Sequence, residues 1–62
     1  MPSTTIKYFK YEHLNGEARE ISKQMAELAE KMEAALPDGP EKSAGMRKLL
    51  EAKDCFVRSV LP

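Results

Sequence analysis

The stretch that decides the fold is Leu36-Pro37-Asp38-Gly39-Pro40, which lies between two long segments with helical periodicity. Pro37 disfavours a helical conformation at Leu36, and Asp38-Gly39 favours a turn in which the glycine takes a positive φ. Pro40 is tolerated in the first turn of a following helix, where its missing N–H has no partner to lose. Because the connection is short, the second helix must return antiparallel to the first. We therefore predict an all-α fold built on one antiparallel helical hairpin.

The segment before this connection predicts a helix over residues 15–36. Asn15 is a preferred N-cap, because its side-chain oxygen accepts a free backbone N–H, and Glu17 suits the positive end of the helix. Apolar residues follow at intervals of four and three, so they form one stripe that we expect to face the core: Ile21, Met25, Leu28, Met32 and Ala35.

The segment after the connection predicts a second helix over residues 40–61. Its apolar face is wider than one partner helix covers, and it comprises Ala44, Met46, Leu49, Leu50, Phe56, Val57, Val60 and Leu61. A chain of 62 residues is marginal as a monomer, and the single cysteine Cys55 rules out an intrachain disulfide. We expect residues 1–62 to form one small helical domain, with residues 1–14 as a lead-in, that assembles into a helical homo-oligomer.

Composition excludes several classes of partner. The ten basic and ten acidic residues cancel, so there is no general attraction to DNA. No apolar run approaches the ~20 residues of a membrane span, and Met1–Thr5 leads straight into charged residues instead of a signal peptide. His13 and Cys55 lack the paired spacing of metal ligands, so we expect neither a metal nor a cofactor. A reducing cytoplasm is the default compartment.

The sequence holds no pattern typical of an enzyme. It lacks a glycine-rich phosphate loop and a G-x-S-x-G nucleophile motif, and its glutamates lie at helical salt-bridge spacing. We interpret His13 as a structural residue at the entrance of the first helix and Cys55 as a small buried hydrophobe. We therefore do not expect catalysis.

The stretch from Lys7 to Leu14 holds three of the four aromatic residues. We assign Phe9 to the core and Tyr8 to the surface, and Tyr11 is left open between the two. A tyrosine ring can stack on a nucleic-acid base while neighbouring lysines meet phosphate. The alternative is that Phe9 and Tyr11 cap the open end of the hairpin.

Several motifs in a fixed order cover nearly the whole chain from Tyr8: Tyr8-Phe9-x-Tyr11-x-His13-Leu14, Ile21-Ser22-Lys23, Leu28-Ala29, Leu36-Pro37-Asp38-Gly39-Pro40-Glu41-Lys42, and Met46-Arg47-Lys48-Leu49-Leu50-Glu51-Ala52-Lys53-Asp54-x-x-Val57-Arg58. Together they resemble small phage proteins of the anti-CBASS protein 2 family. The resemblance implies a helical homohexamer in the cytoplasm of the infected bacterial host. It also implies a sponge that sequesters cyclic dinucleotides such as cyclic GMP-AMP, and cyclic trinucleotides, without cleaving them.

By position in the family pattern, Tyr8 and Lys23 would hold the cyclic dinucleotide across a subunit boundary, and Tyr11 is a further candidate. For a second pocket, which takes cyclic trinucleotides in the family, charge alone nominates Arg47, Lys48, Lys53 and Arg58. The alternative function is a helical protein–protein interaction module without a nucleotide ligand. In that case the apolar arc of the second helix binds a host or phage protein, and Tyr8 merely packs.

Overall fold

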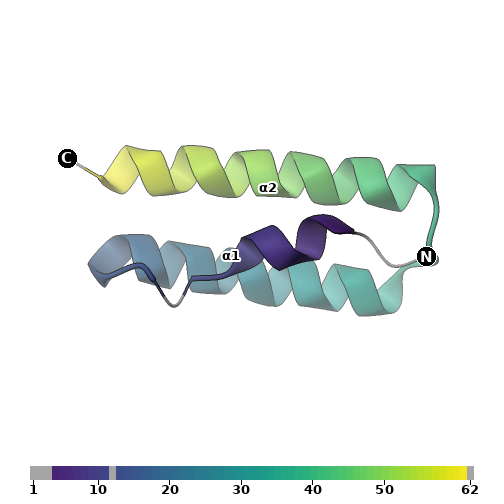
Figure 1. Ribbon diagram of the computed structural model, residues 1–62, viewed down its shortest axis with the longest axis horizontal. Helices are drawn as coiled ribbons and strands as arrows, with labels where there is room; N and C mark the ends of the chain where they lie inside the picture. Colours follow the sequence, from purple (N-terminus) through teal and green to yellow (C-terminus); the bar gives the residue numbers. More distant parts are fainter. Residues whose placement is uncertain (1–3, 12, 62) are drawn as a thin grey trace.

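A computed structural model describes residues 4–11 and 13–61, and these residues contain helices and no strand (Figure 1). The elements in chain order are a 3₁₀ helix η1 (Thr4–Phe9) and the α-helices α1 (Gly16–Ala35) and α2 (Pro40–Val60). The predicted ranges 15–36 and 40–61 are confirmed to within one residue at each end. The two α-helices lie side by side and antiparallel (Figure 1), so the helical hairpin is also confirmed. The part of the lead-in at residues 1–3 and 12 lies outside the described residues.

Helix α1 begins with a backbone cap and not with the predicted side-chain cap. Asn15 has the extended conformation of an N-cap, and its carbonyl oxygen accepts the Arg19 N–H at 3.4 Å. Its side chain makes no capping hydrogen bond. Because that side chain is exposed, water can bond both it and the free N–H groups of the first turn.

The positive φ expected at Gly39 occurs instead at Gly16, where φ is +61°. Gly39 has φ 164°, an extended backbone that any residue adopts. The reason is that Gly39 is the N-cap of α2, where extended φ and ψ are usual. Its carbonyl oxygen accepts the Ser43 N–H at 3.0 Å, and Pro40 occupies the first helical position as predicted.

Small side chains, and not the predicted stripe, form the side of α1 that faces the core. The buried residues of α1 are Ala18, Ser22, Ala26 and Ala29. Leu28, from the predicted stripe, is 41% exposed, and Ala35 is exposed as well. The distance between two packed helices depends on the side chains at their contact, so small residues allow the closest approach. The larger apolar residues therefore lie on the flank of the contact.

One side of the hairpin is closed by η1, which lies across both helices (Figure 1). Phe9 is buried to 3% exposure and packs with Ala26 and Ala29 of α1 and Met46 of α2. The assignment of Phe9 to the core is confirmed. On α2, Met46 and Val57 are buried, whereas Phe56 and the C-cap residue Leu61 remain half exposed.

Candidate functional site

Tyr8 lies on the outer side of η1. A 3₁₀ helix has three residues per turn, so Ile6 and Phe9 share the side that packs on the helices. Tyr8 points elsewhere and is 58% exposed, as the sequence predicted. The Lys7 ammonium nitrogen lies 5.2 Å from the centre of the Tyr8 ring, within cation–π range. Much of the ring is therefore accessible for stacking, with a cation beside it.

Tyr11, which the sequence left open, has both a packing contact and a charged neighbour. It is half-buried at the margin of the core formed around Phe9 and Met46. The guanidinium carbon of Arg19 lies 5.8 Å from the centre of its ring. Sequence reasoning missed Arg19. The spacing in the sequence could have identified it, because Arg19 lies four residues before Lys23 and this places both cations on one side of α1.

Lys23 is exposed on the side of α1 that the N-terminal segment crosses. Four residues before it, Arg19 contacts the ring of Tyr11. Three residues after it, Ala26 lines a hollow of about 150 Å³ beneath η1, together with Ile6, Lys7, Phe9, Lys10 and Glu30. Residues three and four apart are neighbours on a helix, so Lys23 lies along this edge. No hydrogen bond, ion pair or ring contact joins Tyr8 to Lys23 within the part of the chain that the structure describes.

These residues define one surface, which we call the aromatic–basic edge: Lys7, Tyr8, Lys10, Tyr11, Arg19 and Lys23. It combines two rings with four cations. Glu30 lines the hollow beside it, and Glu20 and Glu27 are helical neighbours of Lys23. The arrangement suits a small ligand that carries both flat bases and phosphate groups.

The four cations nominated for a second pocket do not converge in a single chain. Arg47 and Lys48 are exposed, and as successive helical residues they point about 100° apart. Lys53 is half-buried and forms an ion pair with Asp54, with 3.0 Å between Nζ and Oδ1. Arg58 Nη2 donates to the sulfur of Cys55 at 3.5 Å.

The expectation that Cys55 is buried is wrong, because its side chain is exposed. Cys55 follows the buried Met46 by nine residues, which places it on the opposite side of α2. His13 is exposed in the turn before α1, where the Leu14 N–H bonds the Tyr11 carbonyl oxygen at 3.0 Å.

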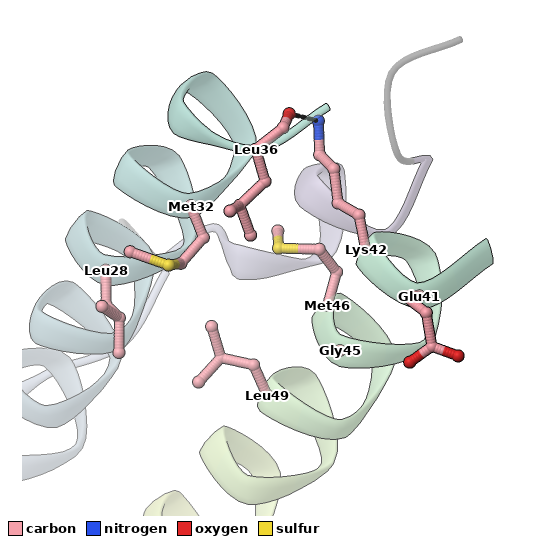
Figure 2. Close-up of a pocket in the computed structure, with 8 residues that line it drawn as sticks. All are labelled: Leu28, Met32, Leu36, Glu41, Lys42, Gly45, Met46 and Leu49. Atoms are coloured by element: carbon pink, nitrogen blue, oxygen red, sulfur yellow. Dashed lines mark hydrogen bonds between the residues drawn. The ribbon is translucent and has the colours of Figure 1, made fainter. Parts of the chain in front are cut away.

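Lys42 is a buried cation whose role the sequence did not reveal. Its ammonium donates to the carbonyl oxygens of Glu33 at 2.8 Å and Leu36 at 3.3 Å, and to Asp38 Oδ1 at 2.7 Å. Figure 2 shows it reaching from α2 to the end of α1. A cation at this position offsets the negative end of the α1 dipole, and the last turn of α1 itself contains no basic residue. Glu33 Oε1 lies 2.9 Å from the same nitrogen, so four oxygens surround three ammonium protons, and Lys42 is structural.

The hydrogen bond between Lys42 and Asp38 shifts the pKa of both groups. It lowers the pKa of the Asp38 carboxyl and, together with the bond to Glu33, raises the pKa of Lys42. Each shift favours the charged form of the group. Asp38 and Lys42 are therefore both charged near neutral pH.

Beside Lys42 an apolar groove of about 290 Å³ runs between the helices (Figure 2). Its lining consists of Leu28, Met32, Leu36, Glu41, Lys42, Gly45, Met46 and Leu49. Since the Lys42 ammonium is already bonded, the groove offers no free cation for a phosphate. It suits apolar side chains and not a nucleotide.

The described residues contain no group of three or more His, Cys, Asp or Glu side chains that could hold a metal ion. None of their helices combines the length and the apolar character needed to cross a membrane. A comparison with protein-family models, curated proteins and solved structures finds no significant match.

Proposed function

We propose that this chain binds and sequesters cyclic dinucleotide second messengers at the aromatic–basic edge without cleaving them. The observation that carries the proposal is the exposed ring of Tyr8 beside Lys7, on the same side of the hairpin as Arg19 and Lys23. Base stacking on an aromatic ring contributes roughly 1–3 kcal/mol per base, and each lysine provides a point charge for a phosphate. The motif resemblance to the anti-CBASS protein 2 family supports the same ligand class.

The symmetry of the ligand favours an oligomer. A cyclic dinucleotide presents two bases and two phosphates about a two-fold axis, so two copies of the edge can each take one half. The absence of a Tyr8–Lys23 contact within the described chain is compatible with a pair formed across a subunit boundary. A homohexamer, as the family resemblance implies, would hold several such sites. The cytoplasm of an infected bacterium is where a sponge of this kind would act.

Cyclic trinucleotides are a further proposed ligand. Lys48 points about 100° away from Arg47, and Arg58 shares the side of Arg47 but lies about 16 Å along α2, so a pocket built from all four cations would need residues of neighbouring subunits. The formal net charge of +0 suits a sponge for small anions, because local cations attract the ligand while the chain as a whole does not attract DNA.

Isothermal titration with cyclic GMP-AMP tests this function. We expect saturable binding, and denaturing the complex should release the ligand intact. Cleavage products would show an enzyme instead. Absence of heat with any cyclic dinucleotide or trinucleotide would discard the sponge.

Substitutions on the edge test the site. Tyr8→Ala should weaken binding about 5- to 150-fold, which corresponds to losing one stacking contact, whereas Tyr8→Phe retains the ring and should bind nearly as well. Lys23→Ala should also weaken binding. Lys31→Ala is its control, because Lys31 is exposed on the same helix in a hollow lined only by α1 residues. Unchanged affinity in both alanine variants at positions 8 and 23 would exclude this site.

The groove favours a second candidate function, a helical protein-interaction module. Leu36 is exposed at one end of the groove and Leu28 lines it, so an apolar segment of a host or phage protein would find contacts there. This function predicts no heat with cyclic nucleotides and no effect of Tyr8→Ala on partner binding.

A further inference from the structure

The hollow of about 150 Å³ beneath η1 adjoins the aromatic–basic edge. Its polar lining comes from two elements, because the N-terminal segment contributes Lys7 and Lys10 and α1 contributes Glu30. The apolar lining consists of Ile6, Phe9 and Ala26. Pockets that hold a drug-sized ligand usually measure about 300–1,000 Å³, so this hollow suits a single base and not a whole cyclic dinucleotide.

The helical periods place the polar groups of the hollow on two different walls. A 3₁₀ helix repeats every three residues, so Lys7 and Lys10, at the end of η1, share one flank. Residues four apart share one side of an α-helix, so Glu30 lies one turn beyond Ala26 on α1. Two ammonium groups therefore line the hollow from the N-terminal segment, and one carboxylate lines it from α1.

Glu30 and Lys10 can both bond a ligand. Both side chains are exposed, and within residues 4–11 and 13–61 neither takes part in a hydrogen bond or an ion pair. Lys7 lies against the ring of Tyr8 instead of against Glu30. A carboxylate that only accepts hydrogen bonds and ammonium groups that only donate them therefore line one small space without being bonded to each other.

The hollow lies within reach of a nucleotide bound at Lys23, the proposed phosphate contact. Glu30 follows Lys23 by seven residues, which places both on one side of α1 and about 10 Å apart along its axis. A nucleotide has a comparable length from its phosphate to the far edge of its base. A nucleotide whose phosphate contacts Lys23 can therefore place the edge of its base beside Glu30.

Guanine has the pattern of donors and acceptors that complements the hollow. Its O6 and N7 atoms accept hydrogen bonds, and lysine is among the residues that donate to them most often. Its N1–H and N2–H groups donate side by side, and an ionised carboxylate has two oxygens that accept. Adenine has an amino group in place of O6 and an acceptor nitrogen in place of N1–H. In the hollow adenine would therefore set a donor against an ammonium and an acceptor against a carboxylate.

We propose that the hollow beneath η1 binds a guanine base, with Lys10 donating to O6 or N7 and Glu30 accepting from N1–H and N2–H. The inference rests on the proposed function, since the base belongs to the cyclic dinucleotide whose phosphate Lys23 binds. It adds which messengers are preferred, namely those that contain guanine. One bidentate contact discriminates about 5- to 150-fold against the wrong base, so the chain should bind cyclic di-GMP at least about tenfold more tightly than cyclic di-AMP.

Isothermal titration with cyclic di-GMP and cyclic di-AMP tests the inference through the ratio of the two affinities. Glu30→Gln replaces one carboxylate oxygen with an amino group that donates. Its affinity for cyclic di-GMP should fall about 5- to 150-fold, while its affinity for cyclic di-AMP should not fall. Lys10→Ala should also lower the ratio.

Glu27→Gln is the matched control for Glu30→Gln. Glu27 is an exposed glutamate of α1, three residues before Glu30, and it is not among the residues that line the hollow. Removing its charge beside Lys23 acts on the phosphate contact and therefore on both ligands alike, so the ratio should remain that of the wild-type chain. Circular dichroism should show that all variants remain helical.

A modified base tests the contact with Glu30 directly. Cyclic di-IMP carries hypoxanthine, which retains O6, N7 and N1–H but lacks the 2-amino group of guanine. The wild-type chain should bind it about tenfold more weakly than cyclic di-GMP, because a hydrogen bond to a charged group is lost. Glu30→Ala has no side-chain acceptor, so it should bind the two ligands with equal affinity.

Equal affinity of the wild-type chain for cyclic di-GMP and cyclic di-AMP would overturn the inference and leave the proposed function standing. An unchanged ratio in Glu30→Gln or Lys10→Ala, or a ratio that falls equally in Glu27→Gln, would overturn it as well. The same follows if cyclic di-IMP binds the wild-type chain as tightly as cyclic di-GMP, or if Glu30→Ala retains the difference. A wild-type chain that binds none of these ligands would discard the proposed function and the inference with it.

Discussion

Lys42 of α2 bonds Glu33 of α1 twice, through the backbone carbonyl oxygen at 2.8 Å and through the carboxylate Oε1 at 2.9 Å. The amine is therefore both a cap for the last turn of α1 and an ion-pair partner for a side chain in that turn. Because Lys42 lies in the first turn of α2, a single side chain joins the two helices at the connection.

Replacing Lys42 should destabilise the fold. In Lys42→Ala the carboxylates of Glu33 and Asp38 lose the Lys42 ammonium, and the Glu33 carbonyl oxygen in the last turn of α1 loses a donor. The midpoint of urea unfolding, followed by circular dichroism, should fall clearly further than in Lys48→Ala, which removes an exposed lysine from the same helix. Equal midpoints for the two variants would show that the cap contributes no stability.

The contacts of Lys42 with Asp38 and Glu33 should make the stability of the fold fall at both acid and alkaline pH. Lys42 lowers the pKa of Asp38 in the folded chain. The Asp38 carboxylate therefore stabilises the fold fully above its unfolded-state pKa of about 3.9, and this stabilisation is lost as the pH falls through its folded-state pKa. Asp38 and Glu33 raise the pKa of Lys42 in the folded chain. The Lys42 ammonium therefore stabilises the fold fully below its unfolded-state pKa of about 10.4, and this stabilisation is lost as the pH rises through its folded-state pKa. Urea midpoints across the pH range measure both effects, and Asp38→Asn should flatten the acid limb.

Gly16 should not tolerate a side chain, although there is room for one. Its φ of +61° is unfavourable for other residues, so Gly16→Ala should cost about 1–2 kcal/mol of unfolding free energy. Gly45 has equally open surroundings within α2, and Gly45→Ala should stabilise the helix by about 0.5–1 kcal/mol. Urea denaturation of the two variants should therefore give shifts of opposite sign. A Gly16→Ala variant as stable as the wild-type chain would mean that the positive φ at Gly16 does not disfavour a side chain.

Phe9 and Tyr8 should differ sharply in their effect on stability. Phe9→Ala removes a ring that is 3% exposed and should cost about 3–5 kcal/mol, comparable to the whole stability of a small domain. Tyr8→Ala removes an exposed side chain and should change stability by less than about 0.5 kcal/mol. Thermal unfolding followed by circular dichroism checks both, and Phe9→Leu should retain a cooperative transition. A comparable loss in both alanine variants would argue that η1 does not pack as described.

The sequence predicted the helices well because their ends are local events. Pro37 and Pro40 act on their own neighbours, and the boundaries followed to within a residue. The core-facing side of α1 was predicted less well. Periodicity ranked Leu28 above Ala26, whereas close helix packing favours the smaller residue at the contact, a choice that depends on the second helix.

In the candidate site too, features set by neighbouring residues were predicted and features set by contacts between elements were not. Burial of Phe9 and exposure of Tyr8 followed from the pattern of neighbouring residues. The contact between Arg19 and Tyr11 depends on the path of the N-terminal segment across α1, which no local pattern encodes. No local pattern marked Lys42 as a buried cation, because its partners lie on the preceding helix and in the connection.

The adjacency of the exposed Tyr8 and the buried Phe9 in η1 has a practical consequence for genetics. One residue anchors the segment and the next carries the proposed contact, so any screen that scores lost binding would recover substitutions at both positions. A Phe9 variant would mimic a defective ligand contact without touching the ligand. Only a parallel assay of folding would separate the two phenotypes. With three residues per turn, substitutions at Ile6 and Phe9 should give the folding defect and substitutions at Tyr8 the ligand defect.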